Sequence, residues 1–330
     1  MKDKLTLKDA MKVIREKYGE GSILTAEKSQ EKVETMPSGS FAIDNILGSG
    51  IPRGRIIELY GEPSQGKSTI SLFIAGQIQK NGGVVAYLDA ENAYDANYAE
   101  KLGVSTKDLI VSQPDTLEEA FDIIRTFAET NSVDLIIVDS VASLTPRAEL
   151  AEDDQFKETM ALQARLLGKA LRINTGIIAK SKTTVIFVNQ TRSKVGVFYG
   201  QKETTPGGKA LKFFSSVRLS VAKVEKIEGT NKEQIGATLK ITAVKNKCAF
   251  PFRSGTIDLY YDSGIDLHSD TLDRAEETGV ITKTGNTYTF GETKLGVGRE
   301  NAKKSLVKNE DIYQAVRTGI IEWQKKIVKA

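Results

Sequence analysis

The chain has 330 residues, of which 40% are hydrophobic and 27% are charged, proportions that are typical of a water-soluble globular protein. This length allows one large domain with an appendage or two ordinary domains. The 46 Lys and Arg residues nearly balance the 43 Asp and Glu residues, so the net charge of +3 does not by itself indicate a nucleic-acid partner.

The single cysteine, Cys248, and the single histidine, His268, exclude an internal disulfide and a His/Cys zinc site within one chain. We expect Cys248 on a buried strand and His268 at the surface. No stretch approaches 18 apolar residues, and the opening MKDKLTLKDA lacks the apolar segment of a secretory signal. We therefore expect a cytoplasmic protein that does not contact a membrane.

The first predicted element is an amphipathic helix over residues 6–18. Apolar side chains recur at helical spacing from Leu7 to Tyr18, Thr6 is placed to cap the helix, and Gly19 should end it. The polar run AEKSQEKVET that follows is typical of a linker. We assign residues 1–33 to this helix and linker, which could pack on their own domain or on a neighbouring chain.

Strands and helices then alternate, which predicts an α/β fold with a largely parallel central sheet. The strands are nearly continuous in apolar residues, as expected when both faces of a sheet are buried. The predicted strands span residues 55–60, 83–89, 134–140 and 183–190. The predicted helices span residues 69–79, 93–103 and 116–129.

The pattern changes after residue 210. Segments 210–227, 237–247 and 255–262 predict adjacent strands, antiparallel to one another. A helix at 271–279, a hairpin around 285–295 and a last amphipathic helix at 311–328 follow. We assign residues 34–267 to the α/β core and residues 268–330 to a small C-terminal α/β domain.

Residues 61–68, GEPSQGKS, match the G-x-x-x-x-G-K-[ST] pattern of a phosphate-binding loop, with a predicted strand before them and a helix after them. Glycines let the backbone amides point inward, Lys67 reaches the β- and γ-phosphates, and the Ser68 hydroxyl coordinates Mg²⁺. The cofactors predicted are ATP and Mg²⁺. The predicted contacts of this loop are Gly61, Glu62, Pro63, Ser64, Gln65, Gly66, Lys67, Ser68 and Thr69.

Polar residues stand at the ends of three other predicted strands, where ligands bind in open α/β sheets. Asp139 is expected to hold Mg²⁺ through water, with Ser140 beside it. Glu91 can deprotonate the attacking water, and Gln190 can sense the γ-phosphate. Together with the phosphate loop, they predict an ATPase.

The segment after Gln190 is basic and rich in glycine, with Arg192, Lys194, Lys202 and Lys209. Such a loop is a plausible binder of a nucleic-acid backbone. Composition alone leaves open a solvated loop with scattered lysines.

Several motifs, in this order, resemble the bacterial RecA family of homologous-recombination ATPases. They are LDAENAYDANYAEKLGV, FVNQTRSKVGVFYG, ETTPGGKALKFF and VKNK, within matching pieces spread from about residue 7 to about residue 305. The resemblance implies a DNA-dependent ATPase that forms head-to-tail helical filaments on single-stranded DNA and exchanges strands with homologous duplex DNA in recombination and repair. It also implies that the filament could provoke self-cleavage of a repressor in an SOS-type response.

The resemblance assigns roles to single residues. Glu91 would activate water, and Gln190 would couple the γ-phosphate to the following DNA-binding loop. The adenine would be contacted by Asp95, Tyr98 and Tyr261. The neighbouring protomer's ATP would be reached in trans by Lys245 and Lys247. The helix of residues 6–18 would then dock on the next protomer.

Two DNA-binding loops, at about 148–160 and 191–208, are implied in the same way. Phe213 matches a residue that links the second loop to the protomer interface. The positions that match DNA contacts are Met160, Arg165, Arg172, Arg192, Lys194, Val195, Gly207 and Gly208.

The chain departs from the family pattern in three places. Residues 62–65 read Glu-Pro-Ser-Gln where the family usually has Pro-Glu-Ser-Ser. The first DNA loop is about one residue longer and carries the acidic residues Glu152, Asp153 and Asp154. The sequence ends at KKIVKA without an acidic tail, from which we expect a lower Mg²⁺ requirement for engaging duplex DNA.

Such departures fit a divergent bacterial or phage-encoded member of the family. Two alternatives to a recombinase remain at this point. One is a ring-forming motor of the same fold, such as a hexameric helicase, and the other is a filament that serves mainly as a scaffold for repressor cleavage.

Overall fold

The computed structural model describes residues 6–23, 33–150, 160–193, 203–204 and 206–329. The chain divides into two compact units, residues 1–34 and 35–330. Most of the predicted linker and of both predicted DNA loops lies outside the described residues. None of the described helices is long and apolar enough to cross a membrane.

The first unit contains helix α1 (Leu7–Tyr18) and a single 3-10 turn, η1 (Glu20–Ser22). The predicted cap is confirmed: Thr6 Oγ1 accepts a hydrogen bond from Asp9 N at 3.3 Å, and Gly19 with φ of 93° ends the helix. Among its described residues α1 buries none, and Leu7 and Tyr18 are 78% and 67% exposed. The apolar stripe of α1 therefore has no partner within the described part of its own unit.

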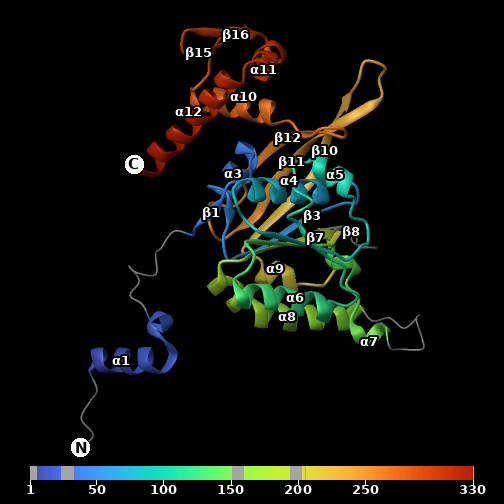
Figure 1. Ribbon diagram of the computed structural model, residues 1–330, viewed down its shortest axis with the longest axis vertical. Helices are drawn as coiled ribbons and strands as arrows, with labels where there is room; N and C mark the ends of the chain where they lie inside the picture. The colour runs from blue at the N-terminus through green and yellow to red at the C-terminus, as the bar shows by residue number, and fades with distance from the viewer. Residues whose placement is uncertain (1–5, 24–32, 151–159, 194–202, 205, 330) are drawn as a thin grey trace, which may run out of the picture. The chain divides into compact units, whose positions relative to one another are not determined.

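Within the described residues, a nine-stranded sheet forms the middle of the second unit (Figure 1), in the order β13-β12-β11-β10-β3-β7-β6-β4-β5. Strands β3, β7, β6 and β4 are parallel, as predicted, and β5, which was not predicted, extends them in the same direction. The strands are β3 (Ile56–Gly61), β4 (Val85–Asp89), β5 (Ile110–Ser112), β6 (Leu135–Asp139), β7 (Thr184–Gln190), β10 (Val217–Glu228), β11 (Gln234–Asn246), β12 (Ser254–Tyr260) and β13 (Gly264–Ile265).

Helices cover both faces of the sheet, with α4 on one face and α6, α8 and α9 on the other (Figure 1). Alternate side chains of β3 supply the two cores, since Ile57 and Leu59 pack on one side and Ile56 on the other. The helices of this region are α3 (Phe41–Leu47), α4 (Lys67–Lys80), α5 (Ala96–Lys101), α6 (Leu117–Thr130), η2 (Val141–Ser143), α7 (Arg147–Leu150), α8 (Met160–Ser181) and α9 (Ala210–Phe214). Two short pairs complete it: β1 (Thr35–Met36) with β2 (Ile51–Pro52), and β8 (Arg192–Ser193) with β9 (Glu203–Thr204).

Three predictions about local structure were wrong. Residues 210–214 form α9 instead of the start of a strand, because ALKFF has no period-two alternation and Leu211 is buried beneath the sheet. Cys248 is half-buried beyond the end of β11, where Asn246 Oδ1 accepts hydrogen bonds from Cys248 N and Ala249 N and ends the ladder. His268 is half-buried, with its ring 4.4 Å from that of Tyr313.

The last part of the chain has a small core of its own, to which Phe41 of α3 also contributes. The predicted hairpin is present, and a third strand extends it. Helix α11 was not predicted. The elements are α10 (Leu267–Thr278), β14 (Thr282–Thr284), β15 (Thr287–Phe290), β16 (Thr293–Val297), α11 (Arg299–Lys308) and α12 (Glu310–Lys329).

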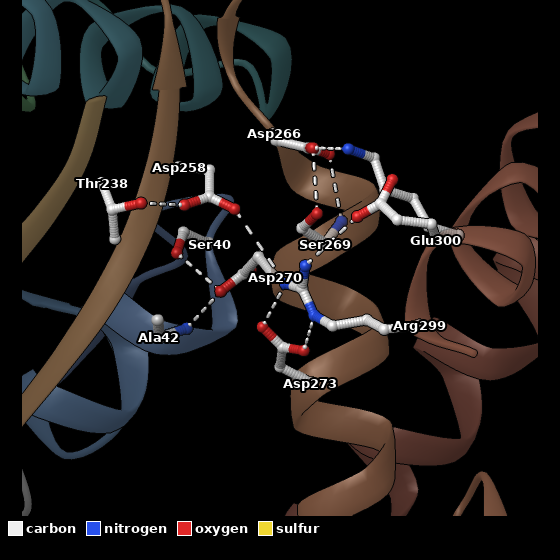
Figure 2. A network of polar contacts seen from close by, with 11 residues as sticks. Ser40, Ala42, Thr238, Asp258, Asp266, Ser269, Asp270, Asp273, Arg299 and Glu300 are labelled. Carbon is white, nitrogen blue, oxygen red and sulfur yellow. Dashed lines mark hydrogen bonds and ion pairs between the residues drawn. The ribbon is translucent and has the colours of Figure 1, made fainter. Parts of the chain in front are cut away.

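A polar network fastens this part to the rest of the second unit (Figure 2). The buried Asp270 of α10 accepts hydrogen bonds from Ser40 Oγ at 3.2 Å, Phe41 N at 2.6 Å and Ala42 N at 2.8 Å, so it caps the first turn of α3. On the other side, Arg299 of α11 donates two hydrogen bonds to Asp273 at 2.9 and 2.8 Å and lies 4.0 Å from Asp258 of β12.

This network should respond to pH. Burial raises the pKa of Asp270 to about 6 from 3.8, although its three hydrogen bonds and Arg317 oppose the shift. Between these values the folded chain binds more protons than the unfolded chain, so the contribution of Asp270 to the free energy of unfolding falls as pH rises. We expect the stability of wild type relative to Asp270→Asn to fall by roughly 3 kcal/mol between about pH 4 and 7.

Denaturant unfolding at several pH values measures this difference. Burial also raises the pKa of Asp44 to about 6. Asp44 is present in wild type and in Asp270→Asn, so its contribution cancels in the difference between their free energies of unfolding. Asp311→Asn is the control, because this exposed residue of α12 lies outside the network. Parallel stability curves for wild type and Asp270→Asn would show that Asp270 titrates normally.

Candidate active site and nucleic-acid interface

The predicted phosphate loop joins β3 to α4 and has the required shape. No side chain fits at Gly61, where a Cβ would lie 2.3 Å from the carbonyl oxygen of Val221, and Gly66 has a φ of +84°. Lys67 Nζ donates a hydrogen bond to the carbonyl oxygen of Glu62 at 2.7 Å, across the loop. Helix α4 begins at Lys67, so its positive end faces the cradle.

Gln65 extends from this loop to the neighbouring strand. Its Oε1 accepts a hydrogen bond from the backbone N–H of Lys223 on β10. The bond ties the loop to the sheet at one of the residues that distinguish this chain from the family pattern.

A pocket of about 230 Å³ opens beside the loop and has two tyrosines in its wall, Tyr98 and Tyr261. Tyr98 OH shares a hydrogen bond with Thr69 Oγ1 at 3.0 Å, and Tyr261 OH accepts one from Gln234 Nε2 at 2.6 Å. Asp95 does not line this pocket; its carboxylate caps α5 by accepting from Tyr98 N. The lining residues are Ser64, Gln65, Gly66, Lys67, Ser68, Thr69, Tyr98, Lys223, Leu259 and Tyr261.

Lys223 and Leu259 line this pocket without having been predicted. Their positions on β10 and β12 follow from the order of strands in the sheet, which the sequence does not reveal.

Asp139 lies beside the loop at the end of β6. Burial raises the pKa of Asp139, opposed by hydrogen bonds from Ser68 and from Tyr87 OH, which donates at 2.8 Å. Burial lowers the pKa of Lys67, opposed by the charges of Asp139 and Glu91. A hydroxyl and a carboxylate at hydrogen-bonding distance from each other form the hard oxygen set that suits Mg²⁺.

Glu91 and Gln190, predicted at the ends of separate strands, are in contact. Gln190 Nε2 donates to Glu91 Oε1 at 3.0 Å, and Ser140 Oγ donates to the same oxygen. Parallel registers of Gly61 with Gln190 and of Asp89 with Asp139 bring these strand ends to one edge of the sheet. The structure therefore brings the predicted base, sensor and Mg²⁺ residues together around the phosphate loop.

Neither Lys245 nor Lys247 lines the pocket described above. Lys245 Nζ donates to the carbonyl oxygens of Lys212 at 2.6 Å and Phe213 at 3.0 Å, at the end of α9. Burial lowers the pKa of Lys245, and the charges of Lys247 and Arg218 add to that effect. Phe213 itself is 69% exposed.

Three of the eight predicted nucleic-acid residues, Met160, Arg165 and Arg172, lie on α8. Arg165, Lys169 and Arg172 are exposed at i, i+4 and i+7, so they share one face of the helix. Lys169 was not among the predicted residues, although its spacing from Arg165 was readable in the sequence. Gly207 packs against this helix, since a Cβ there would lie 2.3 Å from the side chain of Leu167.

The remaining nucleic-acid predictions are only partly described. Met160 begins α8, Arg192 begins β8, and Gly208 has a φ of +69°. Lys194 and Val195 lie outside the described residues, as do the acidic residues 152–154.

Comparison with known proteins gives a consistent family. Residues 5–266 match the RecA N-terminal domain, and residues 269–324 match the RecA C-terminal domain. Protein RecA of a Thermus thermophilus strain is 45% identical over 326 residues, covering 98% of this chain and 96% of that protein. Protein RecA of Bacillus subtilis is 47% identical over 315 residues, covering 95% and 90%.

The crystal structure of the RadB recombinase has a similar fold, with a TM-score of 0.52 and 20% sequence identity, and the match covers 69% of this chain and 98% of that one. The two RecA proteins are 45% and 47% identical to this chain over nearly its full length, and both RecA domain models match it. The phosphate loop at the end of a RecA-like sheet agrees with these matches. The chain belongs to the RecA family of DNA recombination and repair proteins.

Proposed function

We propose that the chain hydrolyses ATP in response to DNA, forms helical filaments on single-stranded DNA in the cytoplasm, and exchanges strands with homologous duplex DNA. The hydrogen bond between Gln190 and Glu91 is the observation that carries this proposal. Gln190 is the last residue of β7, and the basic segment from Thr191 to Lys209 follows it directly. DNA bound by that segment can therefore move the residue that holds the catalytic carboxylate.

The residues of the site divide the chemistry among themselves. Lys67 would turn from the Glu62 carbonyl to the phosphates, and Ser68 with Asp139 would hold Mg²⁺. Mg²⁺, when bound with ATP, neutralises phosphate charge. Glu91 takes a proton from the attacking water while Ser140 keeps its carboxylate in place. When the Gln190 amide turns to the γ-phosphate, Glu91 Oε1 loses one hydrogen-bond donor and becomes free to accept the proton of the attacking water.

A second copy completes the site in this proposal. Lys245 and Lys247 do not line their own pocket, so a head-to-tail neighbour would bring them to the phosphates. The apolar stripe of α1, unpartnered among the described residues of its own unit, would be covered in the same assembly. A ring-forming helicase is not favoured, because the matches are to recombination proteins over nearly the whole chain.

ATP hydrolysis with and without single-stranded DNA tests the proposal, together with electron microscopy of the chain on DNA with a slowly hydrolysed ATP analogue. We expect strong stimulation and helical filaments. Uniform rings, or hydrolysis that DNA leaves unchanged, would contradict it.

The basic face of α8 gives a separate prediction. If Arg165 and Lys169 each contact a phosphate, the variant Arg165→Ala/Lys169→Ala should weaken single-strand binding and reduce the slope of log affinity against log salt by roughly one per lost contact. Fluorescence anisotropy over a salt series measures the slope. Lys80→Ala, which removes an exposed charge at the far end of α4, should leave it unchanged. An unchanged slope in the double variant would place DNA elsewhere.

A further inference from the structure

A buried ion pair lies just before the phosphate loop. Glu58 of β3 is fully buried, and its Oε2 is 2.5 Å from Nε of Arg218 on β10, whose side chain is only 12% exposed. The guanidinium also lies 4.5 Å from the ring centre of Tyr60. Burying two charges costs desolvation free energy, and the attraction between them offsets little more than that cost. The presence of this pair is therefore not explained by stability alone.

Asn189 joins this pair to the sensor and to the second loop. This fully buried residue of β7 donates from Nδ2 to Glu58 Oε1 at 3.0 Å and to the carbonyl oxygen of Pro206 at 3.3 Å. Its Oδ1 accepts from Gln190 N at 2.9 Å. One amide therefore fixes both the backbone of the sensor and the residue that precedes Gly207.

Arg218 also stands beside the lysine expected to act in trans. Arg218 and Lys245 are direct partners in the β10–β11 register, and Lys245 Nζ holds the carbonyl oxygens at the end of α9. Glu58 offsets the repulsion between these two cations, since its charge acts on Lys245 as well. Glu58 thus lies among strands that carry the phosphate loop (β3), the sensor (β7) and the lysine (β11), and Asn189 links it to Pro206.

We propose that Glu58, Asn189 and Arg218 are positioning residues that transmit the state of the nucleotide site to the base of the second DNA loop at Pro206. The inference rests on the proposed function and deepens it. A shift of Gln190 toward a phosphate moves its backbone N–H, and Asn189 passes that shift to Pro206. The ion pair keeps Asn189 in one orientation, because Glu58 Oε1 can accept only from its amide nitrogen.

Glu58→Gln tests this inference, because glutamine keeps the shape of the side chain but removes the charge that holds Arg218. We expect ATP affinity and DNA-free hydrolysis to stay within about twofold of wild type, while the factor by which single-stranded DNA stimulates hydrolysis falls by about tenfold. Asp134→Asn is the matched control, since it breaks an ion pair with Arg53 (2.6 Å) at the opposite end of the same sheet. It should keep the wild-type factor.

If Glu58→Gln does not fold, the double variant Glu58→Gln/Arg218→Met, which leaves no unpaired buried charge, replaces it. The factor by which single-stranded DNA stimulates its ATP hydrolysis should fall in the same way. A folded variant with the wild-type stimulation factor would overturn this inference alone. A parallel fall in melting temperature, ATP affinity and DNA-free hydrolysis would also overturn it, since that pattern marks a purely structural role. A wild-type chain that DNA does not stimulate would overturn the proposed function and this inference with it.

Discussion

Glu91→Gln is expected to slow ATP hydrolysis by about 10²- to 10⁴-fold, the range that a positioned general base contributes. The amide oxygen of the new side chain can still accept from Gln190 Nε2 and Ser140 Oγ, so the surroundings of the site should persist. ATP binding and filament formation on DNA should therefore survive. The loss should appear in turnover at saturating ATP and DNA.

The matched control is Glu100→Gln, which removes the same charge from an exposed position on α5. Single-turnover hydrolysis separates the chemical step from product release. A Glu91→Gln chain that hydrolyses ATP at the wild-type rate would show that another group activates the water.

Lys245→Ala is expected to lower turnover by about 10²- to 10³-fold, the usual cost of losing one donor that stabilises transition-state charge. The proposed arrangement places this lysine and Glu91 of one active site on different copies of the chain. A mixture of two inactive variants should then regain activity. In a random equal mixture of Lys245→Ala and Glu91→Gln chains, about a quarter of the sites receive both intact residues.

Turnover is measured across mixing ratios with total protein fixed, and it should peak near equal amounts. Lys240→Ala, from a more remote part of β11, is the control and should act like wild type when it is mixed with Glu91→Gln. If mixtures of the two inactive variants gain nothing at any ratio, Lys245 acts within its own chain or only through α9.

Much of the core was predictable because its signals are local. Buried parallel strands are nearly continuous apolar runs, and the phosphate loop combines a length, two glycines and a lysine. Polar residues at strand ends then indicated the edge of the sheet at which Asp139, Glu91 and Gln190 meet. The cap at Thr6 followed from the same local reasoning.

The contacts between strands were not predictable from one sequence. Glu58, Asn189 and Arg218 come from three strands that are far apart in the chain, and only the order β10-β3-β7 brings them together. Taken alone, a glutamate in RIIELY suggests nothing more than a polar strand residue. The prediction of residues 210–214 was wrong for a different reason. Five residues are too few to show a helical period, and Leu211 of α9 is buried against parts of the sheet and of α8 that come earlier in the chain.

Gln65 gives the phosphate loop a support that does not depend on nucleotide. A Gly-rich loop on its own samples many conformations. Part of the binding free energy must then offset the entropy that the loop loses when the ligand orders it. The hydrogen bond from Lys223 N restricts that freedom in advance, so we expect this chain to bind phosphate with a smaller ordering cost than one with serine at this position. Because the donor is a backbone amide, side-chain changes at residue 223 other than to proline leave it in place, whereas changing Gln65 removes the acceptor.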